Sequence, residues 1–508
     1  MPKFYLTTAI DYVNSLPHVG TAYEKITADV IARYKRLSGF DTFLLMGNDE
    51  HSYNVRKEAL GKGLEPAEYC DMMAEKFRER WASLEISFDD FIRTTEPRHA
   101  DAVKDLFTKI NGNGDIYKGK YEGYYCVSCE AYLKEKDLAD GNCPVHGTRA
   151  EWLSEENYFF ALSKYAGKLE KHIDENPDFV LPEIRRNEIL NVIKGGLEDV
   201  SISRSSLGWG VPAPVDAAQT IYVWFDALIN YLSGIGYPGT STLFDRYWPC
   251  DLHIVGKDIT RFHCVVWPAM LLSAGIPLPK SIFGHGFVSF KGEKMSKTLG
   301  HVVDPLDVVA KYGADSLRYY LLREVPFGKD GDFSWELFIE RYNSDLANNI
   351  GNLVTRTLGM LERYSNAEVP RSQKRNALDD EVISVSSQTI AEYRQFMDGY
   401  ELHQGVQSAL KLSRRANQYI EESQPWVLAK GGDKERLGTV LAVLSEAIRI
   451  LAGLLCPFLP SKSKEIETLF SIDQVEKAPL KNLAWDENRS RGKKVKPPSP
   501  LFPRIEEK

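Results

Sequence analysis

The sequence predicts a parallel α/β core that is interrupted by a cysteine-containing insertion and followed by a bundle of helices. A β-prone apolar segment, residues 4–8, leads through a tight loop into a helical pattern, as in an α/β unit. Paired metal-ligand residues between positions 126 and 146 mark the insertion. After about Tyr342 the chain becomes poor in glycine and helical patterns take over, which indicates the bundle.

The first strand and helix form a unit that is suited to binding phosphate. Residues 4–8 have the composition of a buried parallel strand, and apolar residues recur at helical spacing from Ala22 to Leu37. The loop between them contains Pro17, His18, Val19 and Gly20. The helix start offers backbone N–H groups to an anion, Gly20 permits close approach, and His18 can donate to phosphate oxygens. The same residues also fit a capped turn before an ordinary amphipathic helix.

The insertion carries four potential metal ligands, which are Cys126, Cys129, Cys143 and His146. Two thiolates at the first spacing form one half of a tetrahedral site, and the second pair forms the other half. Because all four positions are filled by protein ligands, a structural Zn²⁺ ion is expected rather than a catalytic one. Buried or redox-active thiols are the alternative interpretation.

A second cationic segment lies much later in the chain. Lys294 and Lys297 occupy a loop that Gly292 and Gly300 bound. Their ammonium groups can neutralise phosphate oxygens, and the glycines would let the loop close over a nucleotide and open again. A predicted strand at residues 286–290 precedes the loop, and a helix is expected to start at Asp304-Pro305. A solvated basic hairpin tip is the alternative.

The last third of the chain predicts the helical bundle. Two apolar stripes mark its helices: Leu402, Val406, Leu410 and Ile420 form one, and Val440, Leu444, Ile448 and Leu451 form the other. Three polar residues spaced by four, Asn348, Asn352 and Arg356, project from one helix face. Trp426 follows Pro425 at the entry to another segment. Without further information, these residues fit a solvated helix face and a packed tryptophan.

Composition bounds the class of protein. A chain of 508 residues predicts about three or more domains, and 43% hydrophobic with 26% charged residues is typical of a globular protein. The first residues lead directly into a strand, and no apolar run reaches the ~18 residues of a membrane span, so a cytoplasmic protein without a membrane partner is expected. A nucleic-acid partner would have to bind local basic patches, because the net charge is −8. The tail, with a basic stretch at 489–496 and prolines after it, predicts an extended segment in which residues 501–503 could dock back on the body.

Taken together and in this order, the Pro17–Gly20 motif and the Lys294–Thr298 motif resemble the two ATP signatures of class I aminoacyl-tRNA synthetases. The segments between them are similar to the methionyl-tRNA synthetase family, and the likeness runs from Phe4 to about Pro460. These segments are residues 47–51, 202–204, 222–227, 256–259 and 262–263. The resemblance implies a Rossmann-like, doubly wound parallel sheet as the catalytic core, with an inserted zinc-knuckle domain and an α-helical anticodon-binding domain after it.

The resemblance also implies roles for individual residues. The methionine pocket would be lined by Ile10, Tyr12, Asp49, Trp224, Ala227, Tyr231 and His263, with Asp49 holding the substrate ammonium. The ATP site would use Pro17, Gly20, Thr21, Gly256, Asp258, His285, Gly286, Val288, Lys294 and Lys297. Catalysis would be positioning and charge neutralisation by His18, Lys294, Lys297 and Mg²⁺. Asn348, Asn352, Arg356 and Trp426 would read the CAU anticodon.

The implied reaction joins methionine to its tRNA, initiator tRNA included, through an acyl-adenylate made from ATP. The expected domains are core halves at 1–114 and 214–290, the zinc-knuckle insertion at 115–213, a connecting region at 291–343, the anticodon-binding bundle at 344–485 and a tail at 486–508. Some family members carry a further C-terminal dimerisation domain that this sequence does not contain, so a monomer is expected.

The sequence departs from the family pattern in several places. Thr21 stands where a second histidine is usual, and a hydroxyl can donate to phosphate but carries no positive charge. Asn48 replaces Thr, Ser52 replaces Gly, and Thr298 replaces Ser. Slower adenylation is therefore expected. Three alternatives stay open: a synthetase for leucine or valine, a weakened paralogue that only binds tRNA, and a zinc-stabilised nucleotidyltransferase that uses no tRNA.

Overall fold

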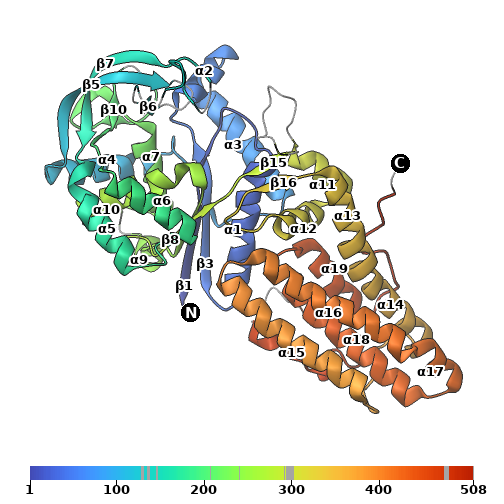
Figure 1. Cartoon of the computed structure of the whole chain (residues 1–508). Coiled ribbons are helices and arrows are strands. Elements are labelled where there is room, and N and C mark those ends of the chain that lie inside the picture. Colours follow the sequence, from blue (N-terminus) through green and yellow to red (C-terminus); the bar gives the residue numbers. More distant parts are fainter. Residues whose placement is uncertain are drawn as a thin grey trace.

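The computed structural model consists of an α/β region and an elongated helical bundle (Figure 1). Between them lie β15 (Val288–Phe290), α11 (Pro305–Tyr312), α12 (Ala314–Glu324), β16 (Gly331–Phe333) and α13 (Trp335–Arg341). It describes residues 1–126, 131–133, 135, 138–144, 147–205, 208–239, 241–290, 292, 303–473 and 480–506. The parallel α/β core followed by a helical region, as predicted, is confirmed.

The core is a seven-stranded sheet in which every pairing is parallel. From one edge to the other its strands are β2 (Asp11–Tyr12) and β4 (Asp90–Arg93), which both pair with β3 (Asp41–Asp49), then β1 (Lys3–Thr8), β13 (Leu252–Gly256), β14 (Ile282–His285) and β8 (Val180–Leu181). β1 is thus flanked by β3 and β13, and the order of the strands reverses there. In open α/β sheets, ligands bind beyond the carboxyl ends of the strands at such a reversal point.

Both faces of the sheet are covered, which is why its strands read as continuous apolar runs. Along β1, Phe4 and Leu6 join one hydrophobic cluster, whereas Tyr5 joins a second cluster on the opposite face. The first cluster includes α1 (Val19–Leu37) and continues into the helical bundle. The second packs against α4 (Pro97–Gly112) and α10 (Trp267–Ala274). The β1–α1 unit therefore sits where the two main parts of the protein meet.

The insertion forms an antiparallel sheet of its own. Its strands are β5 (Ile116–Cys126), β6 (Ala131–Leu133), β7 (Glu151–Phe160) and β9 (Val200–Ser201), and a smaller sheet holds β10 (Ser203–Arg204), β11 (Pro212–Ala213) and β12 (Asp216–Ile221). β5 and β7 pair over ten positions and form the long arch in Figure 1. Within the span 115–213, β8 belongs instead to the core sheet, so this stretch of chain contributes strands to three sheets. The predicted domain borders stay predictions.

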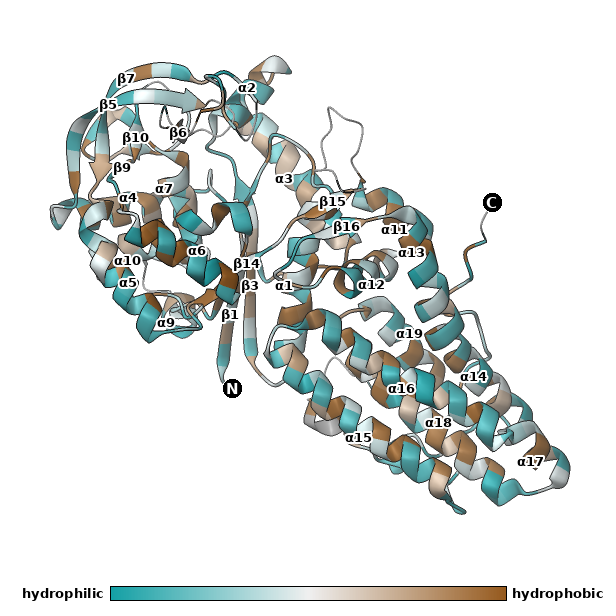
Figure 2. Ribbon diagram, viewed as in Figure 1, coloured by the Kyte–Doolittle hydropathy of each residue, from teal (hydrophilic) through white to brown (hydrophobic). Residues whose placement is uncertain are grey.

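The helical region is built from long amphipathic helices. They are α14 (Asn352–Ser365), α15 (Ala377–Asp398), α16 (Leu402–Ser423), α17 (Pro425–Gly431), α18 (Lys434–Leu455) and α19 (Pro460–Phe470). In Figure 2, hydrophilic and hydrophobic residues alternate along α15 and α16, as in helices with one buried face. α18 is long and apolar enough to cross a membrane, but 94% of its most apolar window is buried inside the protein. Its composition is accounted for by its place at the centre of the bundle.

The C-terminal tail returns to the body, as the sequence suggested. Leu501 and Phe502 are buried, and the Phe502 ring meets Tyr342 edge to face at 6.1 Å. The side chain of Asn343 donates to the carbonyl of Ile505 and accepts from its N–H, both at 2.9 Å. The last described segment is thereby fastened to the entry of the bundle.

One buried arginine connects the two parts of the protein. Arg318, on α12 (Ala314–Glu324), is fully buried and bonds to Asp29 on α1 at 2.6 Å. The same guanidinium donates to the carbonyls of Leu84, Pro457 and Phe458. Pro457 and Phe458 form the turn between α18 and α19, so a single side chain binds the core helix α1 to the bundle.

We expect Arg318→Met to lower the free energy of unfolding by about 3 kcal/mol, because removing one partner of a buried pair leaves Asp29 and several carbonyls without their donors. Arg33 still pairs with Asp29 at 2.8 Å, which keeps the loss from being larger. Urea denaturation measures the change. Arg363→Met, at an exposed arginine of α14, is the matched control and should change stability little. Equal stability of the two variants would contradict the role assigned to Arg318.

Candidate active site

The predicted phosphate-binding turn lies at the carboxyl end of β1, at the reversal point of the sheet. His18 is the N-cap of α1, and the N–H groups of Gly20 and Thr21 donate to its Nδ1 at 3.0 and 3.4 Å. A neutral imidazole that accepts at Nδ1 carries its proton on Nε2, which is the tautomer that can donate to a phosphate oxygen. A side chain at position 20 would place a Cβ 2.8 Å from His18 Cε1, so a larger residue there would displace the imidazole that caps the helix.

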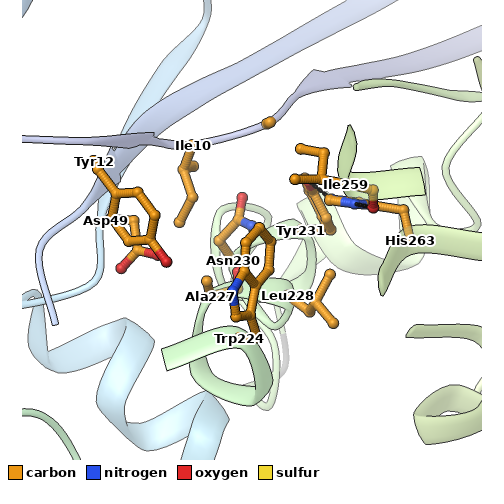
Figure 3. Close-up of a pocket in the computed structure, with 11 residues that line it drawn as sticks. Ile10, Tyr12, Asp49, Trp224, Ala227, Leu228, Asn230, Tyr231, Ile259 and His263 are labelled. Atoms are coloured by element: carbon orange, nitrogen blue, oxygen red, sulfur yellow. Dashed lines mark hydrogen bonds between the residues drawn. The ribbon is translucent and has the colours of Figure 1, made fainter. Parts of the chain in front are cut away.

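The residues predicted to bind methionine come together around one cavity of about 30 Å³ (Figure 3). All seven line it: Ile10, Tyr12, Asp49, Trp224, Ala227, Tyr231 and His263. The sequence had not identified four further lining residues, which are Ala9, Leu228, Asn230 and Ile259. Trp224 stacks on Phe262 at 4.1 Å and closes one wall.

One end of the cavity is polar but uncharged. The Tyr231 hydroxyl lies 2.7 Å from His263 Nε2, and His263 Nδ1 lies 2.9 Å from the carbonyl of Ile259. Burial lowers the pKa of His263 to about 4 and raises the pKa of Tyr231 well above its usual value. A neutral His263 therefore donates a hydrogen bond from Nδ1 to the carbonyl of Ile259 and accepts one at Nε2 from the Tyr231 hydroxyl. Such an end suits a polarisable, uncharged side chain such as a thioether.

The other end of the cavity carries a carboxylate. Asp49 is the last residue of β3, is only 4% exposed, and lies beside Tyr12 in Figure 3. Tyr12 and Asp49 are register partners of β2 and β3, so the sheet itself places them side by side. A buried carboxylate next to apolar walls favours a cationic ligand group, and a substrate ammonium meets that requirement.

A buried ionic cluster behind the pocket was not predicted. Asp226 is fully buried on α7 (Val223–Leu228), and its two oxygens bind His51 Nδ1 at 2.7 Å and His99 Nε2 at 3.0 Å. Burial alone would raise the pKa of Asp226, but the two imidazoles outweigh it and lower that pKa to about 2. His51 follows β3 and Asp226 lies between Trp224 and Ala227, so the cluster holds the pocket helix against the strand end that carries Asp49.

The residues predicted to bind the nucleotide gather at the ends of the neighbouring strands. Gly256 ends β13, and a Cβ there would lie 2.6 Å from Asp258 Oδ1, so the Asp258 carboxylate folds over Gly256 and a larger residue would displace it. His285 ends β14, and its Nε2 lies 2.9 Å from Glu24 on α1. Val288 begins β15 (Val288–Phe290). These residues and the His18 turn lie along the same edge of the sheet.

The second cationic motif falls outside the described residues, since Lys294 and Lys297 belong to the gap 293–302. Its two flanks are described and both reach the His18 turn. The carbonyl of Val288, before the gap, lies 3.6 Å from where a Cβ of Gly20 would be. After the gap, the carbonyl of Val303 accepts a hydrogen bond of 3.1 Å from the N–H of Val19. α11 (Pro305–Tyr312) then starts at Asp304, which caps it as expected.

Comparison with known proteins agrees with this arrangement. Residues 4–151 and 133–358 match the profile of the family described as tRNA synthetases class I (M), and residues 369–508 match the anticodon binding domain of methionyl tRNA ligase. The chain belongs to the methionyl-tRNA synthetase family.

Relatives cover nearly the whole chain. It is 45% identical to a methionine–tRNA ligase of Caldanaerobacter subterraneus subsp. tengcongensis over 99% of this chain and 79% of the relative. It is also 45% identical to one of Thermotoga maritima, over 100% of this chain and 81% of the relative. Among solved structures, the Mycobacterium tuberculosis methionyl-tRNA synthetase in complex with methionyl-adenylate superimposes with a TM-score of 0.95, at 42% identity over 99% of this chain and 100% of that one.

Members of the methionyl-tRNA synthetase family bind tRNA, and the helical bundle of this chain carries a polar groove at the residues predicted to read the anticodon. Asn348, Asn352 and Arg356 line a groove of about 450 Å³ together with residues of α16. The α16 wall, which the sequence had not identified, consists of Arg414, Asn417, Gln418 and Glu421. Asn352 donates to Asn417 at 3.1 Å, and Arg356 pairs with Glu421 at 2.7 Å. Trp426 is 37% exposed at the start of α17 and is not among the residues that line this groove.

Two of the four expected zinc ligands lie among the described residues. Cys126 ends β5 and Cys143 lies in a tight turn, and both are buried. The carbonyl of Thr148 accepts a hydrogen bond from the N–H of Cys143, and the Thr148 hydroxyl lies 3.7 Å from Cys126 Sγ. Thr148 therefore contacts both cysteines. Cys129 and His146 lie outside the described residues. Within the described part of the chain, no group of three metal-binding side chains occurs.

We expect Thr21→His to speed methionine-dependent adenylation by up to about tenfold, because an imidazole in the first turn of α1 can donate to phosphate with positive charge. Thr21 follows the glycine of the phosphate-binding turn, and its side chain is only partly buried, so a larger side chain has room. ATP–pyrophosphate exchange measures the rate. Thr21→Ser keeps the hydroxyl and should behave like the unmodified chain. An unchanged or lower rate for Thr21→His would show that Thr21 is no handicap.

Proposed function

We propose that this chain joins methionine to tRNA in two steps at the sheet edge described above. A carboxylate oxygen of methionine attacks the α-phosphorus of ATP, and the bond from that phosphorus to the bridging oxygen breaks to release pyrophosphate. A ribose hydroxyl of the terminal adenosine of tRNA, the 2′-hydroxyl by class I membership, then attacks the acyl carbon and displaces AMP. Neither step needs a nucleophile from the protein.

The residues assigned to the reaction act by position and charge. His18 donates from Nε2 to phosphate, while Lys294 and Lys297 neutralise the triphosphate together with Mg²⁺, which is carried in with ATP. Gly256, Asp258, His285 and Val288 hold the adenosine, and Pro17, Gly20 and Thr21 form the turn beneath the phosphates. Asp49 takes the methionine ammonium, and the neutral Tyr231–His263 pair meets the thioether.

The hydrogen bond from Val19 to Val303 carries this proposal, because it returns the chain after the Lys294 loop to the His18 turn. A loop that leaves and re-enters beside one turn can place its lysines over whatever that turn binds. Amino-acid-dependent ATP–pyrophosphate exchange is the deciding experiment. Methionine should support exchange, whereas leucine and valine should not. Equal exchange with leucine would overturn the assignment of the pocket.

We further assign the polar groove between α14 and α16 to the CAU anticodon. Amides can bond to the edges of unpaired bases, and exposed tryptophans stack on them. Arg356 is held by Glu421 and becomes available to a phosphate or base when that pair opens. Initiator and elongator tRNA(Met) share the anticodon, so both are substrates under this proposal.

The cysteines fit a structural Zn²⁺ ion. Cys126 and Cys143 are buried, and both contact Thr148. One cysteine from each predicted ligand pair therefore lies next to the same residue. Together with Cys129 and His146 they would hold the metal, which would cross-link the insertion where its short strands supply little core. We also propose that the protein is a monomer in the cytoplasm. Light scattering tests the oligomeric state, because a monomer has the chain mass of 57.5 kDa.

We expect Trp426→Ala to raise the KM for tRNA by about tenfold, since stacking of a base on an aromatic ring contributes ~1–3 kcal/mol. ATP–pyrophosphate exchange without tRNA should be unchanged. Val427→Ala, at the neighbouring exposed apolar residue, is the matched control and should alter neither activity. If Trp426→Ala lowers both activities together, the residue supports the fold instead.

We expect the purified chain to hold about one zinc ion, and Cys126→Ser or Cys143→Ser to lose it, because each cysteine supplies one of four ligands. Elemental analysis measures the metal. Cys456→Ser removes an equally buried cysteine from the bundle and should keep the full zinc content. The same metal content in all three variants would rule out these ligands.

A further inference from the structure

A fully buried lysine lies directly behind the wall that the two substrate sites share. Lys25, on α1, has no exposed surface. Its Nζ donates to the carbonyl of Ala9 at 2.6 Å and to Glu24 Oε1 at 2.7 Å, and it lies 3.2 Å from Asp11 Oδ2. Because Lys25 is sealed from solvent, it cannot touch a ligand, and neither step of the reaction uses it.

The bonds of Lys25 bracket a residue of the methionine pocket. β1 ends at Thr8 and β2 begins at Asp11, so the chain between them leaves one ladder before it joins the next. The N–H of Ala9 still bonds to Ile254 on β13, whereas its carbonyl turns to Lys25. Lys25 thus holds the carbonyl before Ile10 and the carboxylate after it. Ile10 lines the cavity, and the strand continues to Tyr12 and its partner Asp49.

The second carboxylate leads to the nucleotide side. Glu24 bonds to Lys25 through Oε1 and to His285 Nε2 through Oε2, at 2.7 and 2.9 Å. His285 Nδ1 lies 2.7 Å from the carbonyl of Gly286, so both of its nitrogens face oxygen acceptors. Burial opposes the charge of Glu24, but Lys25 and then His285 outweigh burial and lower the pKa of Glu24 to about 2. Asp11, Lys25, Glu24 and His285 form a continuous polar row from β2 to the end of β14.

We propose that Lys25 is a positioning residue that sets the methionine pocket and the nucleotide-side strand end in register, so that the attacking carboxylate meets the α-phosphorus in line. α1 carries the His18 turn at its N-terminus, and Lys25 lies two turns further along the same helix. One ammonium group therefore ties the phosphate turn, the pocket wall and the adenosine-side histidine to each other. In-line attack tolerates little error in the position of either reactant.

A purely structural lysine would behave differently, and substitutions can separate the two roles. A buried ion pair is often replaceable by an apolar side chain of similar volume without loss of stability, whereas removing one partner alone is costly. Lys25→Met removes the bonds to Ala9 and Asp11 on the pocket side and the bond to Glu24 on the nucleotide side. Glu24→Gln keeps the shape but removes the charge that Lys25 and His285 both face, so it weakens the bonds toward His285 and leaves Lys25 bound to Ala9 and Asp11. The double variant Lys25→Met/Glu24→Gln removes one charge of each sign and restores the balance inside the core.

Steady-state ATP–pyrophosphate exchange and thermal unfolding, measured on the same full-length variants, test the proposal. Lys25→Met should raise the KM for methionine about tenfold and the KM for ATP severalfold, because the binding groups are misplaced, and should lower kcat about tenfold, because the attack is no longer in line. Glu24→Gln should raise the KM for ATP alone. The double variant should regain thermal stability but keep the raised KM for methionine. Lys171→Met, at a lysine that is 73% exposed, is the control and should match the unmodified chain.

Recovery of the KM for methionine together with stability in the double variant would overturn the proposal, and so would unchanged KM values in a folded Lys25→Met variant. Asp11→Asn provides an independent test if Lys25→Met does not fold. It leaves Lys25 paired with Glu24 and weakens only the interaction of Lys25 with the segment that carries Ile10 and Tyr12. The KM for methionine should therefore rise, while the KM for ATP stays constant. An unchanged KM for methionine in that variant contradicts the role of Lys25 directly.

Discussion

One buried guanidinium fixes the direction in which the helical bundle meets the core. A charged group deep inside a protein is tolerated only where its partners are all in place, because its desolvation costs several kcal/mol. Arg318 meets that condition with a carboxylate on α1 and three carbonyls from two other parts of the chain. Rotating the bundle relative to the core would leave the charge without some of these acceptors. Apolar contacts alone, which are not directional, would allow such sliding.

This constraint bears on function because α1 belongs to both parts of the protein. Its first residues form the phosphate turn, its middle carries Asp29, and the hydrophobic cluster around it extends into the bundle. The groove of Asn348, Asn352 and Arg356 is thereby held at a set place relative to the active site. The His18 turn and the groove are therefore both positioned through contacts to one helix, α1.

The sequence predicted the parts of the site that are local and could not predict those that are not. Strand, turn and helix at the His18 motif follow from apolar periodicity and one glycine, and the structure has them where expected. The predicted methionine pocket draws on four separate segments, so only resemblance to a family could assemble it, and residues outside the family's motifs, such as Asn230, were missed. Arg318 lies 289 residues from Asp29, and His51 lies 175 residues from Asp226. No local pattern links such pairs.

Buried charges were missed for a further physical reason. A lysine or aspartate inside a helical pattern reads as part of a solvated face, since most such residues are exposed. α1 contradicts that expectation at Glu24, Lys25 and Asp29, which are all buried within about one and a half turns. Buried pairs of this kind add little stability compared with apolar packing, so their value lies elsewhere. Their hydrogen bonds are directional, so they fix the relative positions of the segments that they join. An active site that is assembled from strand ends, an inserted sheet and a distant loop needs such fixed positions.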